Sequence, residues 1–182
     1  LTTLFAGTTT STAATAEGNA DLKGQIKQRC YGAPKEVPVQ PANPYDLIYL
    51  VSNGALQSVA LYDGGVALTN DGDEPDIAAL RGASIAPGHF RTCLALGLVR
   101  LGGAPIMTVT ADPVEGATDA ERTAAQIARR MLVDLGIPPN EIITGAFDAL
   151  DEINDAAIGY FVSDDRSALA AVQDVLDSVG GW

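Results

Sequence analysis

Apolar residues recur at steps of three and four positions over residues 119–135, which is the spacing of one face of an α-helix. Thr118 stands before this stretch as a candidate N-cap, and Glu121 follows it as a capping box requires. Gly136 occupies the position where a left-handed residue commonly ends a helix, and Pro138 cannot continue one. We therefore predict an amphipathic helix with one apolar stripe, formed by Ala124, Ile127, Ala128, Met131, Leu132 and Leu135.

The same pattern returns 44 positions later without a gap, so that Leu135-Gly136 is matched by Val179-Gly180. This second copy predicts another helix near residues 165–179. Both apolar stripes are interpreted as core-facing. The sequence leaves open an alternative in which the opposite helix faces meet neighbouring subunits, through Arg129, Arg130, Asp174 and Asp177.

Shorter apolar runs separated by turn signals fill residues 21–112, which is the pattern of β-strands. Asp63-Gly64-Gly65 and Asn70-Asp71-Gly72 are the clearest tight turns, and a short helix is expected near residues 76–80. The runs predict an antiparallel β-meander, with strands near residues 26–31, 47–51, 57–62, 66–68, 90–94, 98–101 and 106–110.

The chain is therefore expected to have an α+β fold, in which an antiparallel β-meander half is followed by two strand–helix units. Residues 1–20 are of low complexity and predict a flexible arm or linker. Residues 21–112 form the mainly β region, in which the Pro-rich stretch Gly32–Pro44 is an extended connection. Residues 113–182 form the α/β region, with the two helices near 119–135 and 165–179, a shorter helix over 147–153 and a strand over 158–162.

Charge is distributed unevenly along the 182 residues, which carry a net charge of −12. Residues 1–100 have 7 basic and 9 acidic side chains, whereas residues 101–182 have 4 and 14. An acidic field repels a polyanion, so specific nucleic-acid binding is not expected. The basic cluster of the chain is interpreted as a solvated strand edge, and it consists of Lys23, Lys27, Arg29 and Lys35.

The two cysteines, Cys30 and Cys93, stand far apart and lack metal-ligand spacing. Two buried free thiols are expected, with a disulfide as the alternative. No run reaches the roughly 20 apolar residues that a membrane-spanning helix requires, and the first residues lack the pattern of a signal peptide. No membrane association is therefore expected. Because the chain begins at Leu1 and ends at Trp182 directly after a predicted helix, we expect it to be a segment of a longer polypeptide.

Candidate catalytic and metal-binding residues lack the partners that such chemistry needs. His89, the single histidine, has no nucleophile or carboxylate at a suitable spacing and is interpreted as a turn or surface side chain. The acidic stretch Asn70–Asp76 does not follow the EF-hand order and is interpreted as a solvated turn. We predict no enzyme and no catalytic, cofactor-binding or metal-binding residues. A further acidic group is interpreted as a solvent-facing helix face, formed by Asp148, Asp151, Glu152 and Asp155.

A series of short motifs follows one order along the chain: Asp21-Leu22-Lys23-Gly24, Tyr31-Gly32, Leu47-Ile48-Tyr49, Tyr62 to Leu68, Val109 to Asp112, Asp119 to Ile127, and Asp165 to Trp182. With these motifs the chain resembles the middle portion of the large tail-tip proteins, or baseplate hub proteins, of long-tailed phages and gene transfer agents. The resemblance covers nearly the whole chain from Ala20 onward. Two departures are Gln25-Ile26-Lys27-Gln28, where such proteins usually have prolines, and Pro113, which interrupts the segment after Val109–Asp112.

This resemblance implies a phage tail hub domain and a structural role in the tail tip of a virion that is assembled in the host cytoplasm. It implies contacts with other tail proteins, namely the tail tube and the distal tail and tip proteins, within a homotrimeric ring. It offers no catalytic residues to carry over. The helical end is also similar to the hub proteins of contractile tails and to type VI secretion spikes, a likeness of fold alone. The acidic C-terminal half predicts that such a ring has an acidic inner surface, past which DNA moves without sticking.

Two other classes of function compete with this interpretation. A host-receptor or carbohydrate-binding module of a tail tip needs an exposed aromatic platform, and the chain has four Phe, five Tyr and one Trp. A hydrolase of cell-wall polymer needs paired carboxylates or a metal-binding triad, which the spacing of these residues does not assemble.

Overall fold

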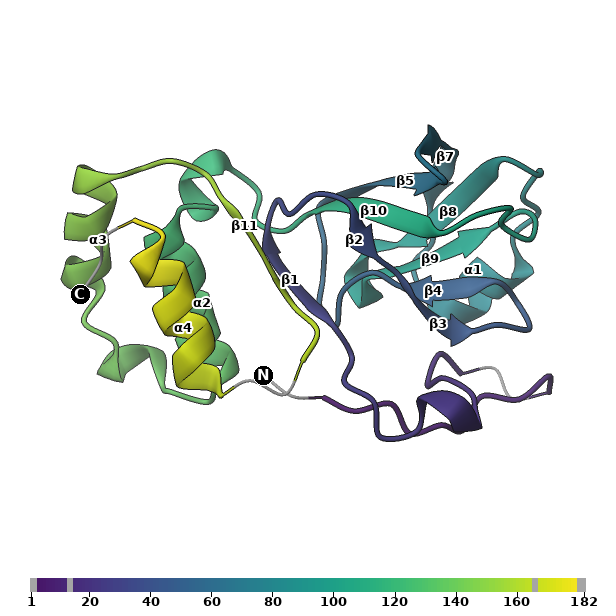
Figure 1. The fold of residues 1–182 in the computed structure, drawn as a ribbon, viewed down its shortest axis with the longest axis horizontal. Coiled ribbons are helices and arrows are strands. Elements are labelled where there is room, and N and C mark those ends of the chain that lie inside the picture. Colours follow the sequence, from purple (N-terminus) through teal and green to yellow (C-terminus); the bar gives the residue numbers. More distant parts are fainter. Residues whose placement is uncertain (1–2, 13–14, 165–166, 180–182) are drawn as a thin grey trace.

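Strand β1 (Arg29–Gly32) divides the molecule into two lobes, as seen in a computed structural model that describes residues 3–12, 15–164 and 167–179. One lobe, which we call the β lobe, contains two sheets (Figure 1). The other, the α lobe, contains a two-stranded ribbon and three helices. The expected α+β class is confirmed: the described residues form four α-helices and three sheets.

The β lobe packs its two sheets around one apolar core. The first sheet is antiparallel throughout and has the order β2 (Val37–Pro38), β10 (Val109–Val114), β5 (Ser58–Asp63), β6 (Val66–Ala67). The second has the order β3 (Gln40–Asn43), β4 (Ile48–Leu50), β9 (Leu98–Leu101), β8 (His89–Cys93), β7 (Thr69–Asp73). Buried and partly buried positions alternate along β10, so that Val109 and Ala111 face inward with Leu61, Phe90 and Val99.

The second sheet is covered on its other face as well. Ile48 and Leu50 of β4 pack there against Leu80 of helix α1 (Ile77–Gly82) and against Phe5, which is only 1% exposed. The expectation of a flexible arm over residues 1–20 is therefore corrected for its described part. Phe5 N donates to Gln25 O at 2.9 Å, and this segment runs along the β lobe to the 3₁₀ turn at Ala20–Leu22 (Figure 1). The low-complexity composition predicted little burial, but Phe5 is a large apolar side chain that packs on the sheet and holds this segment.

The α lobe is built on the antiparallel pairing of β1 with β11 (Gly159–Val162). Helix α2 (Ala124–Asp134) packs against helix α4 (Ala168–Asp177), and α3 (Thr144–Ile153) lies beside them (Figure 1). Tyr31 of β1 is fully buried between the helices, in a core that also contains Ile127, Met131, Val172 and Val175. Both predicted apolar stripes thus face this core, except that Leu169, which was expected to begin the second stripe, is 76% exposed.

The 44-residue repeat is confirmed at the start of both helices, although its first cap was misplaced. Thr123 accepts a hydrogen bond from the backbone N–H of Gln126, and Ser167 accepts one from that of Ala170. Thr118 makes no side-chain cap, because residues 119–121 form a separate 3₁₀ turn. At the C-terminus of α2, Gly136 has φ +85° and its N–H donates to Val133 O, as predicted for a left-handed end. The matching Gly180 lies outside the described residues.

Strand positions were predicted better than their pairing. The expected meander is wrong, because β5 pairs with β10 and β4 pairs with β9, while β7 and β8 are parallel. The Pro-rich connection contains β2 and β3, and the predicted turn at residues 70–72 lies within β7. Pro113 lies in β10 at a point where β2 has already ended, so its missing N–H interrupts no pairing on that side.

The predicted boundary at residues 112 and 113 and the two strand–helix units are corrected together. Strand β10 runs through that boundary, and β1, which was assigned to the β region, is the strand that pairs with β11. The two helices therefore share one ribbon in place of two separate strands. No helix within the described residues has the length and apolar character to span a membrane.

Candidate functional site

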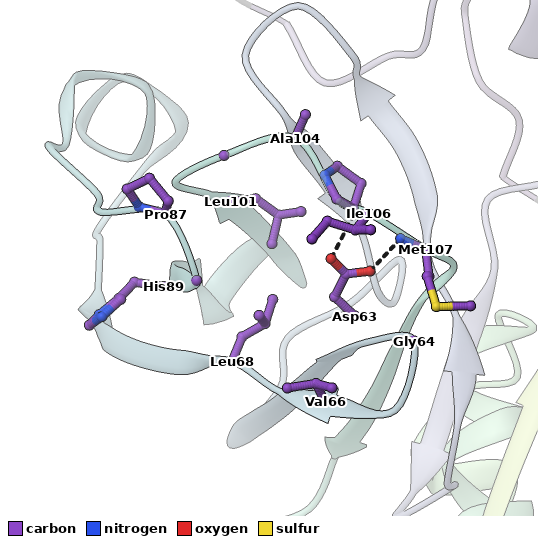
Figure 2. A pocket seen from close by; sticks show the side chains of 13 residues that line it. Asp63, Gly64, Val66, Leu68, Pro87, His89, Leu101, Ala104, Ile106 and Met107 are labelled. Carbon is purple, nitrogen blue, oxygen red and sulfur yellow. Dashed lines mark hydrogen bonds between the residues drawn. The ribbon is translucent and has the colours of Figure 1, made fainter.

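An apolar cavity of about 410 Å³ opens on the β lobe, between the β5–β6 hairpin and the loop that leads into β10 (Figure 2). The side chains of Leu68 and Leu101 point into it (Figure 2). Leu101 is 3% exposed and belongs to the core, so the floor of the cavity is continuous with the packed interior. The lining consists of Asp63, Gly64, Val66, Leu68, Pro87, Gly88, His89, Leu101, Gly103, Ala104, Pro105, Ile106 and Met107.

The Asp63 carboxylate holds one wall of the cavity in place. Its two oxygens accept hydrogen bonds from the backbone N–H groups of Ile106 and Met107, each at 2.7 Å (Figure 2). Asp63 ends β5, and Gly64 and Gly65 follow with φ +57° and +83°. Positive φ at both central residues is the geometry of a two-residue hairpin turn, which glycine adopts without strain. The wall is therefore preformed by backbone geometry and two charge-assisted hydrogen bonds.

Three large apolar side chains stand at the cavity without being buried. Val66 is 69% exposed, Ile106 93% and Met107 66%. They come from two separate segments, the β6 strand and the loop before β10, and meet around one opening. Scattered exposed apolar residues are normal on a protein surface, whereas a group around a cavity is typical of an interaction site.

One edge strand of the first sheet lies at this cavity, and one edge strand of the second sheet begins directly after Leu68. Strand β6 ends the order of the first sheet and β7 ends the order of the second. The chain crosses from one edge to the other at Leu68, whose N–H donates to Leu61 O at 2.9 Å and whose side chain lines the cavity. An unpaired strand edge presents free N–H and C=O groups to any extended chain that approaches it.

His89 lies at the margin of the cavity, as a surface side chain in agreement with its interpretation. Its Nδ1 is 2.8 Å from an Asp71 carboxylate oxygen, and the ring points away from the opening (Figure 2). The lining residues include no Ser, Thr or Cys that His89 could activate. The pair joins β7 to β8 and forms no nucleophile–base arrangement.

The acidic stretch near β7 has structural partners for its side chains. Asn70 accepts a hydrogen bond from Gly72 N, as a solvated turn predicts. Asp73 accepts from Thr92 Oγ1 and Leu94 N, Glu74 pairs with Arg91, and Asp76 caps α1. Among the described residues, no group of three or more His, Cys, Asp or Glu side chains is arranged to hold a metal ion.

The basic cluster is solvated only in part, because Lys23 and Lys35 are exposed as expected while Lys27 and Arg29 are not. Lys27 is 12% exposed at its side chain, pairs with Glu17 at 2.7 Å and lies over the Phe5 ring. Arg29 lies over the Tyr31 ring, and both donate to the Asp134 carboxylate, at 3.3 and 2.8 Å. The sequence could not show the Asp134 partner, because it lies more than 100 residues away along the chain.

The proposed outer faces of the helices are also engaged within the chain. Arg130 pairs with Glu115 at 2.7 Å, and Arg129 donates to Gln126. Asp174 accepts from the Tyr160 hydroxyl, and Asp177 from Gln173. The acidic residues of α3 are mostly exposed as expected, except that Asp151 is partly buried and accepts from Gln126.

Both thiols are free and fully buried, which confirms the expectation of two buried cysteines. Burial raises the pKa of the Cys30 thiol to about 12, and it also raises the pKa of Cys93. Thiols of this kind are packing groups and poor nucleophiles.

Sequence reasoning missed the cavity because Ile106 was placed at the start of a strand. The strand β10 begins only at Val109, so Ile106 and Met107 lie in the loop that forms the cavity wall. The signal that could have revealed this is Pro105, which precedes two large apolar residues directly after Gly102-Gly103.

The chain was compared with protein-family models, with curated protein sequences and with solved structures, and none of the three comparisons found a match.

Proposed function

We propose that this chain is a structural component of a phage tail tip or baseplate hub, which links the tail tube to distal tip proteins through protein–protein contacts. The observation that carries the proposal is the exposed apolar group of Val66, Ile106 and Met107 around a preformed cavity beside the edge strand β6. Such a surface suits a permanent contact with another protein, because removing apolar surface from water is favourable in free energy. The choice of a phage tail as the assembly rests on the ordered sequence motifs that resemble tail-tip proteins.

The two-lobed arrangement supports a building block with contacts at separate places. The cavity lies on the β lobe, while the α lobe carries most of the acidic side chains of the chain. In a homotrimeric ring, each copy uses one surface toward its neighbour and another toward the lumen. We place the acidic α lobe toward the lumen, where like charge keeps passing DNA from sticking. Acidic residues that face outward in an assembled ring would contradict this orientation.

A receptor- or carbohydrate-binding role has less support. Among the described residues, Tyr45 is the exposed aromatic side chain, at 55%, and it stands apart from the cavity lining. A sugar platform usually needs several exposed rings. Binding to a panel of host surface glycans would favour that alternative.

The test is to locate the chain in particles. Antibodies raised against residues 1–182 are applied to purified tails from the producing strain, with immunogold electron microscopy and mass spectrometry of the tail fraction as readouts. We expect label at the distal end of the tail and chain peptides in the fraction. A matched fraction of tailless heads serves as the control. Presence of the chain in cell lysate but absence from tails would overturn the proposal.

A further inference from the structure

We propose that the cavity and the free edge of β6 together bind an extended segment of another polypeptide, which adds a strand beside Ala67 and places a bulky apolar side chain in the cavity. That this polypeptide is a neighbouring tail protein rests on the function proposed above. The strand-addition site itself follows from three features of the described residues: the direction of the free backbone groups of β6, the face that the cavity occupies, and the charge around it.

The backbone of Ala67 is directed away from its own sheet. In the β5–β6 hairpin, Asp63 is opposite Val66 and Tyr62 is opposite Ala67, while Leu68 N donates to Leu61 O. Opposite residues in an antiparallel pair alternate between exchanging hydrogen bonds and exchanging none. Because the pairs on either side of it are the bonded ones, Ala67 directs its N–H and C=O outward. Both residues of β6 are exposed, so an incoming strand can reach these groups.

The cavity lies on the face toward which an added strand would direct its side chains. Val66 and Leu68 are two positions apart, so they share one face of the strand, and both line the cavity. A strand paired at Ala67 directs every second side chain to the same face. Strand addition of this kind takes affinity from the backbone hydrogen bonds and specificity from pockets for alternate side chains. The volume of about 410 Å³ accommodates a large apolar side chain with room to spare.

Strand β7, the edge strand that follows β6 along the chain, is protected against the same pairing. Its register shifts between Asn70 and Asp73, and the Gly72 N–H is already bonded to the Asn70 side chain. An irregular, acidic edge of this kind discourages strand addition. Strand β6 is short, but it has no register shift and no charged residue, and it is the edge at which Val66 is exposed.

The charges around the cavity indicate which residues the bound segment should carry. The ionisable side chains of the cavity lining are Asp63 and His89, and His89 pairs with the Asp71 carboxylate, so the charged groups at the opening are carboxylates. An anionic amphiphile such as a fatty acid would meet like charge at the opening. A segment that carries Lys or Arg on either side of its apolar residue complements this field and gains in association rate.

The test uses the ¹⁵N-labelled chain and a short synthetic peptide with Leu at alternate positions and Lys and Thr between them. We expect shift changes confined to the amides of residues 64–69, 103–104 and 106–107, with slower hydrogen exchange at the Ala67 amide. Two control peptides replace Lys by Glu or carry N-methyl groups on alternate amides, and both should bind at least about tenfold more weakly. Equal binding of the N-methylated peptide would exclude strand addition.

A matched pair of variants distinguishes binding at the cavity from non-specific binding to exposed apolar residues. Ile106→Ser changes a side chain that is 93% exposed at the cavity, and Ile143→Ser changes one that is 77% exposed on the α lobe. Both should fold, and only Ile106→Ser should lose binding, by about tenfold or more. Equal loss in both variants, or binding of a neutral alkyl glucoside without binding of the peptide, would overturn the inference. Because no particles are needed, failure here leaves the tail assignment standing, and absence of the chain from tails leaves this site standing.

Discussion

Glu115 joins the two lobes at the level of single atoms. It is 8% exposed, its carboxylate accepts from Gly32 N at 3.1 Å and from Arg130 at 2.7 Å, and its own N–H donates to Gly32 O. The three groups belong to the segment after β10, to β1 and to α2, so one side chain fixes their relative positions. A buried carboxylate is stable only with such partners.

Removing this carboxylate should destabilise the chain. Glu115→Ala leaves Gly32 N–H and Arg130 without their acceptor, at a cost of about 2 kcal/mol in the free energy of unfolding by urea. Glu115→Gln keeps an acceptor and should cost less. The exposed Glu141→Ala serves as the matched control, with a change within about 0.5 kcal/mol. Equal stability of Glu115→Ala and wild type would show that these hydrogen bonds contribute nothing net.

The buried thiol of Cys30 predicts a dependence of stability on alkaline pH. Its pKa is about 12 in the folded chain against an ordinary value of 9.0, so folding retains a proton that the unfolded chain releases. This contribution to stability is complete below pH 9 and is lost as the pH rises toward 12. Urea unfolding of Cys30→Ala between pH 8 and pH 10.5 should therefore show a shallower decline than that of wild type. A steeper or equal decline would contradict the raised pKa.

At the residue scale, the sequence predicted residues whose role depends on local composition better than residues that form the candidate site. Free cysteines, the left-handed Gly136 and the surface placement of His89 depend on local composition, and the structure agrees with them. Asp63 and Ile106 depend on contacts between segments that are far apart along the chain, since the carboxylate at the end of β5 positions the loop before β10. No local pattern encodes that contact, so the sequence could indicate at most a loop after Pro105 and could not predict that this loop forms the wall of a cavity.

Helices α2 and α4 show how much a periodic pattern determines at the scale of the element. Their apolar stripes predicted both helices and the faces that pack together, because burial of such a stripe is the main source of helix stability in a folded protein. The start of α2 was harder to locate, since Thr118 and Thr123 both precede residues that can be helical. Thr123 is the N-cap because the chain first makes the 3₁₀ turn at residues 119–121.

Two alanine substitutions distinguish these cap positions. Thr123→Ala removes the acceptor for Gln126 N–H and should lower the free energy of unfolding by about 1 kcal/mol. Thr118→Ala, at an exposed side chain without a cap hydrogen bond, should change it by less than about 0.5 kcal/mol. Thermal or urea unfolding followed by circular dichroism measures both. A larger loss of stability for Thr118→Ala than for Thr123→Ala would show that Thr118 is the N-cap, as the sequence predicted.

Strand pairing marks the limit of prediction at this scale. Alternation and turn residues located most strands, whereas partners such as β4 with β9 or β5 with β10 depend on contacts across much of the chain. A tight turn predicts pairing only between the strands that it joins, as it does for β5 and β6. The meander was therefore the default arrangement, and long-range packing replaced it.

For the whole molecule, the α lobe should not fold without β1. Tyr31 fills its core and β11 has no other described strand partner, so a fragment of residues 113–182 lacks both. We expect poorly dispersed amide shifts and no cooperative thermal transition for this fragment, in contrast to the full chain. Addition of a synthetic peptide of residues 26–34 should restore part of the helical signal. A cooperative transition in the isolated fragment would show that the lobe is an independent domain.

The pairing of β1 with β11 also constrains how the protein is made. During translation, β1 leaves the ribosome long before β11, the strand that pairs with it, has been synthesised. Until β11 is synthesised, Tyr31 and the unpaired edge of β1 are exposed to other nascent chains. Contacts between such distant segments form slowly. A cell that produces many copies at once must therefore shield this strand, through a chaperone or through the order in which the remaining strands collapse.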